Sequence, residues 1–178
     1  MPEVEELFGK QMSWPRLIIK FGVEALLAYN AYNYMTDYKP DWDCWASGKR
    51  QPSGVETEGA RNVTEEFTTV ISFMFYGSLV GALVSFLEIC NKKAKNKQLT
   101  VFIGIADTII GLAAFAWLIW ASFVRLGRDG KICAGATTNV SVQVKPYAYA
   151  QGAFLQVMLV LMYVIPPSLF VATNCGCL

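Results

Sequence analysis

The chain of 178 residues contains no histidine, and charged residues make up only 16% of it. Without histidine it lacks the usual general base near neutral pH, the commonest zinc ligand and the imidazole ligands of haem. It also lacks a glycine-rich phosphate loop, a histidine-containing catalytic triad and a Gly-x-Ser-x-Gly elbow. A net charge of +1 gives no basic footprint for nucleic acid. We therefore expect a protein that is not an enzyme and that binds neither cofactors nor nucleic acid.

What the chain has in abundance is apolar residues, which make up 54% of it and give a mean hydropathy of +0.35. Soluble domains are about 45–50% apolar with about a quarter of their residues charged, so the composition indicates an integral membrane protein. A membrane helix needs roughly 20 predominantly apolar residues. Four stretches approach or exceed that length: 17–35, 67–90, 100–124 and 150–173. They predict an all-α, four-helix transmembrane bundle that forms a single domain over residues 1–178.

The first stretch is the least apolar of the four because it contains Lys20, Glu24 and Asn30. The tyrosines toward its end suit an aromatic belt at the membrane interface. A helix lying on the membrane surface is the alternative for this stretch.

Four lysines between Lys92 and Lys97 lie between the second and third predicted spans, and they indicate the orientation. The density of this cluster favours a cytoplasmic turn with both termini inside, although a bare count of basic residues does not. The N-terminus has no basic secretory signal and no arginine-rich mitochondrial presequence. We expect the plasma membrane or an endomembrane rather than the mitochondrial inner membrane.

This orientation places one cysteine in each of the two outer loops, Cys44 in the first and Cys133 in the second. Both would then lie in the oxidising compartment, which predicts a disulfide between them. Asn139 begins an Asn-Val-Ser sequon in the second outer loop and is a candidate for glycosylation.

The other three cysteines, Cys90, Cys175 and Cys177, would face the reducing cytoplasm at the membrane edge. Cysteines in that position are candidates for palmitoylation. They do not make two pairs with the spacing of a zinc site, so we expect no metal site.

Asp107 in the third span is the sharpest exception to the apolar pattern. An ionisable side chain within a span costs about 2.5–3.5 kcal/mol on insertion scales, so it should face the bundle interior or a watery cavity. At about 1.5 Å per residue, Lys20 lies roughly 8 Å beyond Pro15 and Asp107 roughly 12 Å beyond Leu99, so their depths match. We expect Lys20 and Asp107 to pair. Glu24 then either stays protonated or reaches water or a partner subunit.

Small residues recur along the second and third spans. They are Gly77, Gly81 and Ser85 in the second span, and Gly104, Thr108 and Gly111 in the third. Such rows let helix backbones approach closely, which matters because lipid offers no hydrophobic drive for helix association. We expect these rows to pack inside the bundle, and a homodimer face is the alternative.

The layout of four spans with a short inner turn and both termini inside resembles the MARVEL-type tetraspan membrane proteins. The resemblance covers nearly the whole chain and implies a role in membrane apposition, vesicle traffic or lateral organisation. Claudin-like families share the layout, but their first outer loop carries a Gly-Leu-Trp signature and two cysteines. Here that loop offers Trp42-Asp-Cys44-Trp45 and a single cysteine, which argues against a claudin.

Together these features favour a non-enzymatic structural or accessory subunit of a larger membrane assembly, or a protein of membrane organisation. Its partners would be the lipid bilayer and other membrane proteins, with no soluble substrate. One alternative is a small ion or proton channel or transporter centred on Asp107, although the chain has few other polar positions within its spans. Another is an accessory subunit of an organellar energy-converting complex.

Overall fold

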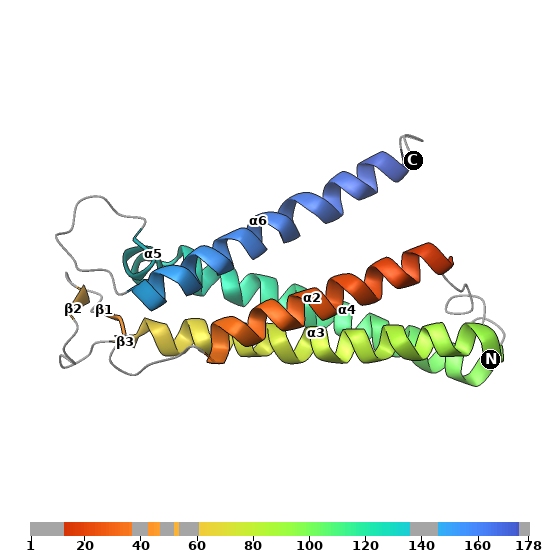
Figure 1. The fold of residues 1–178 in the computed structure, drawn as a ribbon. Helices are drawn as coiled ribbons and strands as arrows, with labels where there is room; N and C mark the ends of the chain where they lie inside the picture. The colour runs from red at the N-terminus through yellow and green to blue at the C-terminus, as the bar shows by residue number, and fades with distance from the viewer. Residues whose placement is uncertain (1–12, 37–42, 47–51, 54–60, 136–145, 175–178) are drawn as a thin grey trace. The chain divides into compact units, whose positions relative to one another are not determined.

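The computed structural model describes residues 13–36, 43–46, 52–53, 61–135 and 146–174 (Figure 1). These ranges are almost wholly helical, which confirms the expected all-α class. The helices are α2 (Trp14–Thr36), α3 (Val63–Ala94), α4 (Lys97–Leu126), α5 (Arg128–Cys133) and α6 (Pro146–Asn174). Each of the four predicted spans lies within one of the long helices.

Two of these helices, α3 and α4, are long and apolar enough to cross a membrane. The helix α2 is not among them, since charged residues in its first half and asparagines and tyrosines in its second make it less apolar. In α6 the apolar segment found among the described side chains covers only Ala148–Tyr163. Among the described residues, two helices therefore have membrane-spanning length and composition.

An asparagine side chain caps the N-terminus of each of these two helices. At the start of α3, Asn62 Oδ1 accepts a hydrogen bond from the backbone N–H of Glu65 at 3.1 Å. At the start of α4, Asn96 Oδ1 accepts one from the N–H of Leu99 at 3.2 Å. Each asparagine thus satisfies a backbone donor that has no partner within its own helix, which is the role of an N-cap.

The turn between α3 and α4 is built around the side chain of Asn91, which is only 2% exposed. Its amide donates to Asn96 O at 3.1 Å and to Thr100 Oγ1 at 2.8 Å, while its Oδ1 accepts from Asn96 N at 3.0 Å. Lys95 has a φ of 52°, the left-handed conformation that commonly ends a helix. Side-chain hydrogen bonds therefore fix this helical hairpin at its closed end.

The chain divides into two compact units. Unit 1 comprises Met1–Asn33 with Ser72–Trp117, and unit 2 comprises Tyr34–Ile71 with Leu118–Leu178. Helices α3 and α4 each contribute one part to unit 1 and the other part to unit 2.

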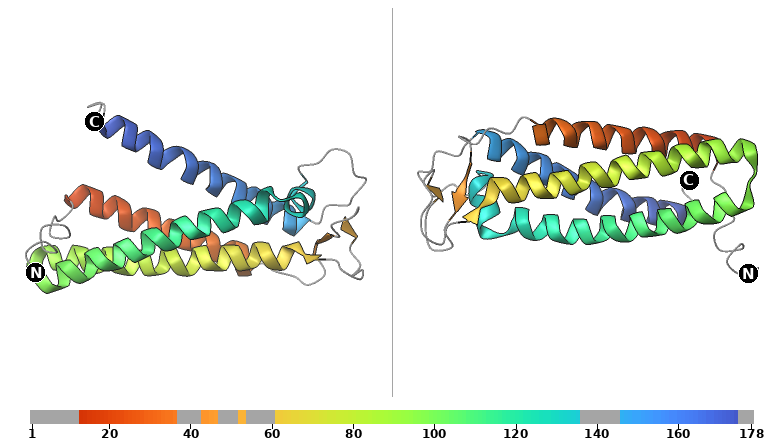
Figure 2. Two further views of the ribbon diagram at one scale, coloured as in Figure 1. Left: turned by 180° about the vertical axis from the view of Figure 1, so that it is seen from behind. Right: turned by 90° about the horizontal axis from the view of Figure 1, so that it is seen from below.

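Unit 1 is a three-helix arrangement in which α2 runs antiparallel to α3 (Figure 2). Three contacts of aromatic rings join α2 to α3. In order along α2 they are Trp14 with Lys92, Phe21 with Phe86, and Tyr32 with Phe75. Residue numbers rise along α2 while they fall along α3, which sets the direction. Leu17 of α2 and Ile103 of α4 are buried in this unit.

Unit 2 contains elements that the sequence did not indicate. Three two-residue strands, β1 (Trp45–Ala46), β2 (Pro52–Ser53) and β3 (Arg61–Asn62), form an antiparallel sheet in the order β2-β1-β3. Trp45 pairs with Ser53 on one side and with Asn62 on the other. The helix α5 lies in a stretch that was expected to be a loop.

These short elements were missed for a physical reason. A strand of two residues or a helix of six is too short to show a hydrophobic period, which is the main signal in a sequence. Isolated helices of that length are also unstable in water, so α5 depends on its tertiary contacts.

Candidate functional site

Lys20 of α2 and Asp107 of α4 form an ion pair in unit 1. The Nζ atom of Lys20 lies 2.7 Å from each carboxylate oxygen of Asp107. The two side chains keep 24% and 28% of their surface exposed. The structure thus places side by side the two residues that we expected to pair because they lie at similar depths in their helices. Since the ammonium bridges both oxygens, each charge is compensated within a largely apolar stretch of helix.

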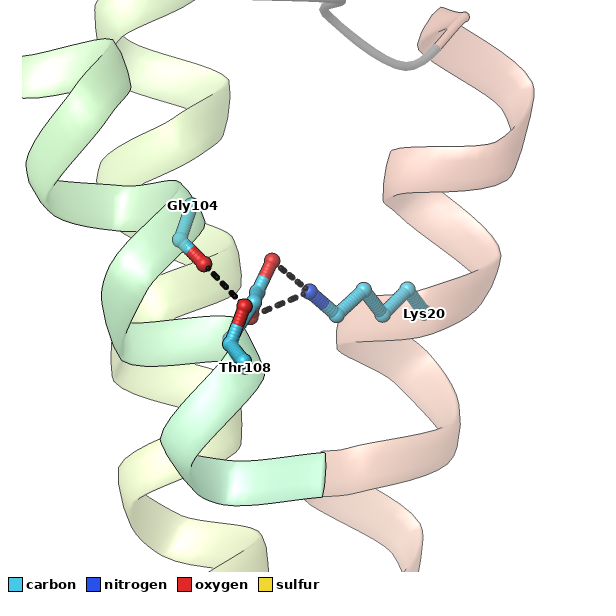
Figure 3. A network of polar contacts seen from close by, with 4 residues as sticks. Lys20, Gly104 and Thr108 are labelled. Carbon is cyan, nitrogen blue, oxygen red and sulfur yellow. Dashed lines mark hydrogen bonds and ion pairs between the residues drawn. The ribbon is translucent and has the colours of Figure 1, made fainter. Parts of the chain in front are cut away.

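Thr108 and Gly104 lie on α4 close to this ion pair and are hydrogen-bonded to each other. Thr108 Oγ1 donates to the backbone oxygen of Gly104 at 2.9 Å, one turn earlier in the same helix (Figure 3). This bond satisfies the threonine hydroxyl inside α4. Figure 3 shows Lys20 reaching from α2 to this turn of α4.

Glu24, one turn after Lys20, is held by α3. The hydroxyl of Ser78 forms a hydrogen bond with its carboxylate. The carboxylate also rests on Gly81, where an added Cβ would lie 2.9 Å from Glu24 Cδ. A glycine at position 81 therefore makes room for the acid. We call the group Lys20, Glu24, Ser78 and Asp107 the polar layer.

The sequence reasoning missed Ser78 as the partner of Glu24. The hydroxyl contact is compatible with the protonated Glu24 that was one of the expected alternatives, because a hydroxyl can also accept a hydrogen bond. The available signal was the position of Ser78 three residues before Gly81, which puts both on one face of α3. Ser85 follows on that face and is fully buried, and its Oγ has no hydrogen-bond partner among the described residues.

The small-residue rows separate into buried and open positions. Gly81 and Ser85 are buried, whereas Gly77 and Gly111 are exposed and have no described atom within 4 Å of where a Cβ would sit. The close packing expected at Gly77 and Gly111 is therefore not found in the described part of the chain. Around a helix of 3.6 residues per turn, Ser78 and Ser85 are displaced from Gly81 by about 60° and about 40° in one direction, and Gly77 by about 40° in the other, so Gly77 lies outside the buried face.

In unit 2, Cys44 and Cys133 lie at disulfide distance, with their Cα atoms 5.9 Å apart. Cys133 is the last residue of α5, and both cysteines are buried. The backbone of Cys44 also binds the start of α3: its oxygen accepts from Val63 N at 3.0 Å and its N–H donates to Thr64 Oγ1 at 2.8 Å. The pairing joins the two loops in which the sequence placed one cysteine each.

Two buried polar side chains connect α6 to the rest of unit 2. Arg125 Nε donates to the backbone oxygen of Gly152 at 2.7 Å. Gln151 Nε2 donates to Thr68 Oγ1 at 2.9 Å. A Cβ at Gly152 would overlap the side chain of Ala134, so the backbone of α6 lies close to the end of α5 there. Neither Arg125 nor Gln151 was singled out from the sequence, because polar residues near the ends of apolar segments are common.

The remaining predicted site residues differ in what the structure describes. Cys90 is an exposed free thiol, as the palmitoylation hypothesis requires. Asn139, Cys175 and Cys177 lie outside the described residues. Within the described ranges, no group of three cysteine, aspartate or glutamate residues is placed to hold a metal ion.

Comparison of the chain with known protein families, with curated proteins and with solved structures finds no match. In the polar layer, the ammonium of Lys20 is bound to both oxygens of Asp107, and Glu24 is hydrogen-bonded to Ser78. This arrangement joins three helices through polar contacts.

Proposed function

We propose that the chain is a multi-pass membrane protein with four spans, 17–35, 67–90, 100–124 and 150–173. We further propose that it acts in the plasma membrane or an endomembrane as a non-enzymatic structural or accessory subunit of a larger assembly. The observation that carries the proposal is the exposed apolar surface of α4.

Large apolar side chains are exposed along the whole of α4. The most apolar 18-residue stretch of this helix is only 11% buried, against 44% for the corresponding stretch of α3. The exposed residues include Phe102, Ile105, Ile109, Leu112, Phe115, Ile119 and Phe123. They recur every three or four positions, so they form one continuous face. In water such a face would favour aggregation, whereas in a bilayer it meets lipid or another helix.

The polar layer supports a packing role better than a conducting one. Lys20 binds both oxygens of Asp107, and Glu24 contacts Ser78, so these side chains join helices of the same chain. In lipid, polar contacts and close packing decide which helix faces meet. What α4 then offers to its surroundings is an apolar surface suited to neighbouring helices. The layout resemblance to MARVEL-type tetraspan proteins agrees with a role in membrane organisation.

The membrane part of the proposal is tested by alkaline carbonate extraction of native membranes. We expect the chain to stay in the membrane pellet and to be released only by detergent. Release by carbonate alone would contradict membrane integration.

The subunit part is tested by photo-crosslinking in native membranes with benzoylphenylalanine placed at Leu112, which is 67% exposed. The matched control carries the same probe at Ile103 on the same helix, which is only 4% exposed. We expect discrete protein adducts from position 112, and mass spectrometry of complexes purified in mild detergent should identify the same proteins. Lipid adducts alone at position 112 would overturn the subunit proposal.

A further inference from the structure

We propose that the turn between α3 and α4 binds anionic phospholipid headgroups. We call residues 91–97 the basic turn. The inference rests on the proposed function, because only a membrane-inserted hairpin places this turn at the depth of the headgroups.

The charge of the basic turn is concentrated and of one sign. It contains Lys92, Lys93, Lys95 and Lys97, and no acidic residue occurs in the chain between Glu88 and Asp107. Lys93, Lys95 and Lys97 are exposed. Ammonium groups are multiple hydrogen-bond donors that suit phosphate and carboxylate oxygens, which are the acceptors that anionic headgroups offer.

The backbone beneath these lysines is held in place. Asn91 is hydrogen-bonded to the main chain of Asn96 and to the hydroxyl of Thr100, and the left-handed Lys95 completes the turn. A fixed turn presents its lysines together without the entropic cost of ordering a loose loop on binding. The basic turn is therefore a preformed surface.

The depth of the turn fits a headgroup partner. It joins the two helices that are long and apolar enough to span a membrane, so it lies where both of them leave the apolar layer. Trp14 at the start of α2 lies at the same end of unit 1, with the Nζ atom of Lys92 5.4 Å from its ring centroid. Tryptophan is enriched at membrane interfaces, and Arg16 in the first turn of α2 is a further exposed basic residue.

The size of the effect follows from the surface potential of anionic membranes. Each lysine near such a surface contributes about fivefold to association. Four lysines acting together should therefore enrich anionic lipid around the basic turn. Removal of their charge should reduce this enrichment by at least about tenfold, a figure that allows for screening by salt.

The test uses the full chain with Cys175→Ser and Cys177→Ser, so that Cys90 is the single thiol for labelling beside the Cys44–Cys133 pair. Cys90 is exposed and lies two residues before Lys92. A donor fluorophore on Cys90 reports energy transfer to acyl-labelled phosphatidylserine or to acyl-labelled phosphatidylcholine in phosphatidylcholine nanodiscs. We expect preferential transfer to phosphatidylserine, and loss of the preference in 1 M salt, where the Debye length is about 3 Å.

The decisive variant replaces the four lysines of the basic turn with glutamine. Its matched control replaces four other lysines with glutamine: Lys39, Lys49, Lys131 and Lys145. The preference should vanish in the first variant and persist in the second. Equal transfer to the two lipids by the unmodified turn, or a preference that survives its neutralisation, would overturn the inference. A chain that fails to enter nanodiscs at all would instead contradict the proposed membrane function.

Discussion

Unit 1 has an ion pair between two long helices, whereas unit 2 combines a cysteine pair between two loops with polar contacts between helices. In unit 1 the central contact is the Lys20–Asp107 ion pair, in which each partner compensates the charge of the other. In unit 2 the central contact is the Cys44–Cys133 pair, supported by Arg125 on a backbone oxygen. Unit 1 therefore depends on charge balance, and unit 2 depends on a cross-link and on backbone hydrogen bonds.

Removal of Lys20 should have the largest effect, because it leaves Asp107 without its counter-charge. We expect Lys20→Met to destabilise the protein by about 3–5 kcal/mol, the range for breaking a buried pair on one side only. Thermal melting in mild detergent, followed by tryptophan fluorescence, measures the change. Lys131→Met, at an exposed position of α5, serves as the control and should melt close to the unmodified protein.

The double variant Lys20→Met with Asp107→Leu sharpens this test. Since it removes both charges together, it should be more stable than Lys20→Met alone. Additive losses in the cycle would show that the two residues do not stabilise each other, and unit 1 would then not depend on charge balance.

Loss of the cross-link in unit 2 should have the next largest effect. The two cysteines are 89 positions apart, and a disulfide that closes a long loop typically stabilises by about 2–4 kcal/mol. Cys44→Ser with Cys133→Ser should lower the melting temperature and should make it independent of reductant. Cys90→Ser, at the exposed free thiol, is the matched control and should leave both properties unchanged. If both Cys44 and Cys133 alkylate without prior reduction, unit 2 has no cross-link.

Gly81 tests how tightly the polar layer is packed. A Cβ at this position would meet the end of the flexible Glu24 side chain, which must shift and weaken its contact with Ser78, so Gly81→Ala should be less favourable than Gly77→Ala by about 1 kcal/mol. Gly77→Ala on the same helix meets open space and should be neutral or stabilising by about 0.5–1 kcal/mol, since alanine favours helix. Equal effects of the two substitutions on the melting temperature would mean that Glu24 does not rest on Gly81.

The two units also differ in how much of them could be predicted from the sequence. In unit 1, apolar runs longer than a soluble helix needs predicted the helices, and equal depths in neighbouring spans predicted the partner of Asp107. The contact of Glu24 with Ser78 was missed because the register between α2 and α3 depends on packing that neither helix shows alone. Only contacts in the structure, such as that of Phe21 with Phe86, show how α2 is aligned with α3.

In unit 2 the prediction of the cysteine pair needed only one cysteine in each of two loops. The strands and α5 gave no periodic signal, and the burial of Arg125 and Gln151 depends on neighbours from distant parts of the chain. Local patterns therefore predict long elements and simple pairs, and they do not predict structure that exists only through tertiary contacts.

The smallest predicted effect concerns the hairpin that closes unit 1. Lys95 has a φ of 52°, a conformation that carries a steric cost for a residue with a Cβ and almost none for glycine. Lys95→Gly should therefore stabilise the protein by about 0.5–1 kcal/mol, less than the intrinsic cost because glycine also gains entropy in the unfolded chain. Lys93→Gly is the matched control, since it removes the same charge from a helical position of α3 and should destabilise by about 0.5–1 kcal/mol. The two variants lose equal charge, so a difference in melting temperature between them reports backbone conformation alone. If both variants melt below the unmodified protein by the same amount, the turn gains nothing from glycine, and the left-handed geometry at Lys95 is not what ends α3.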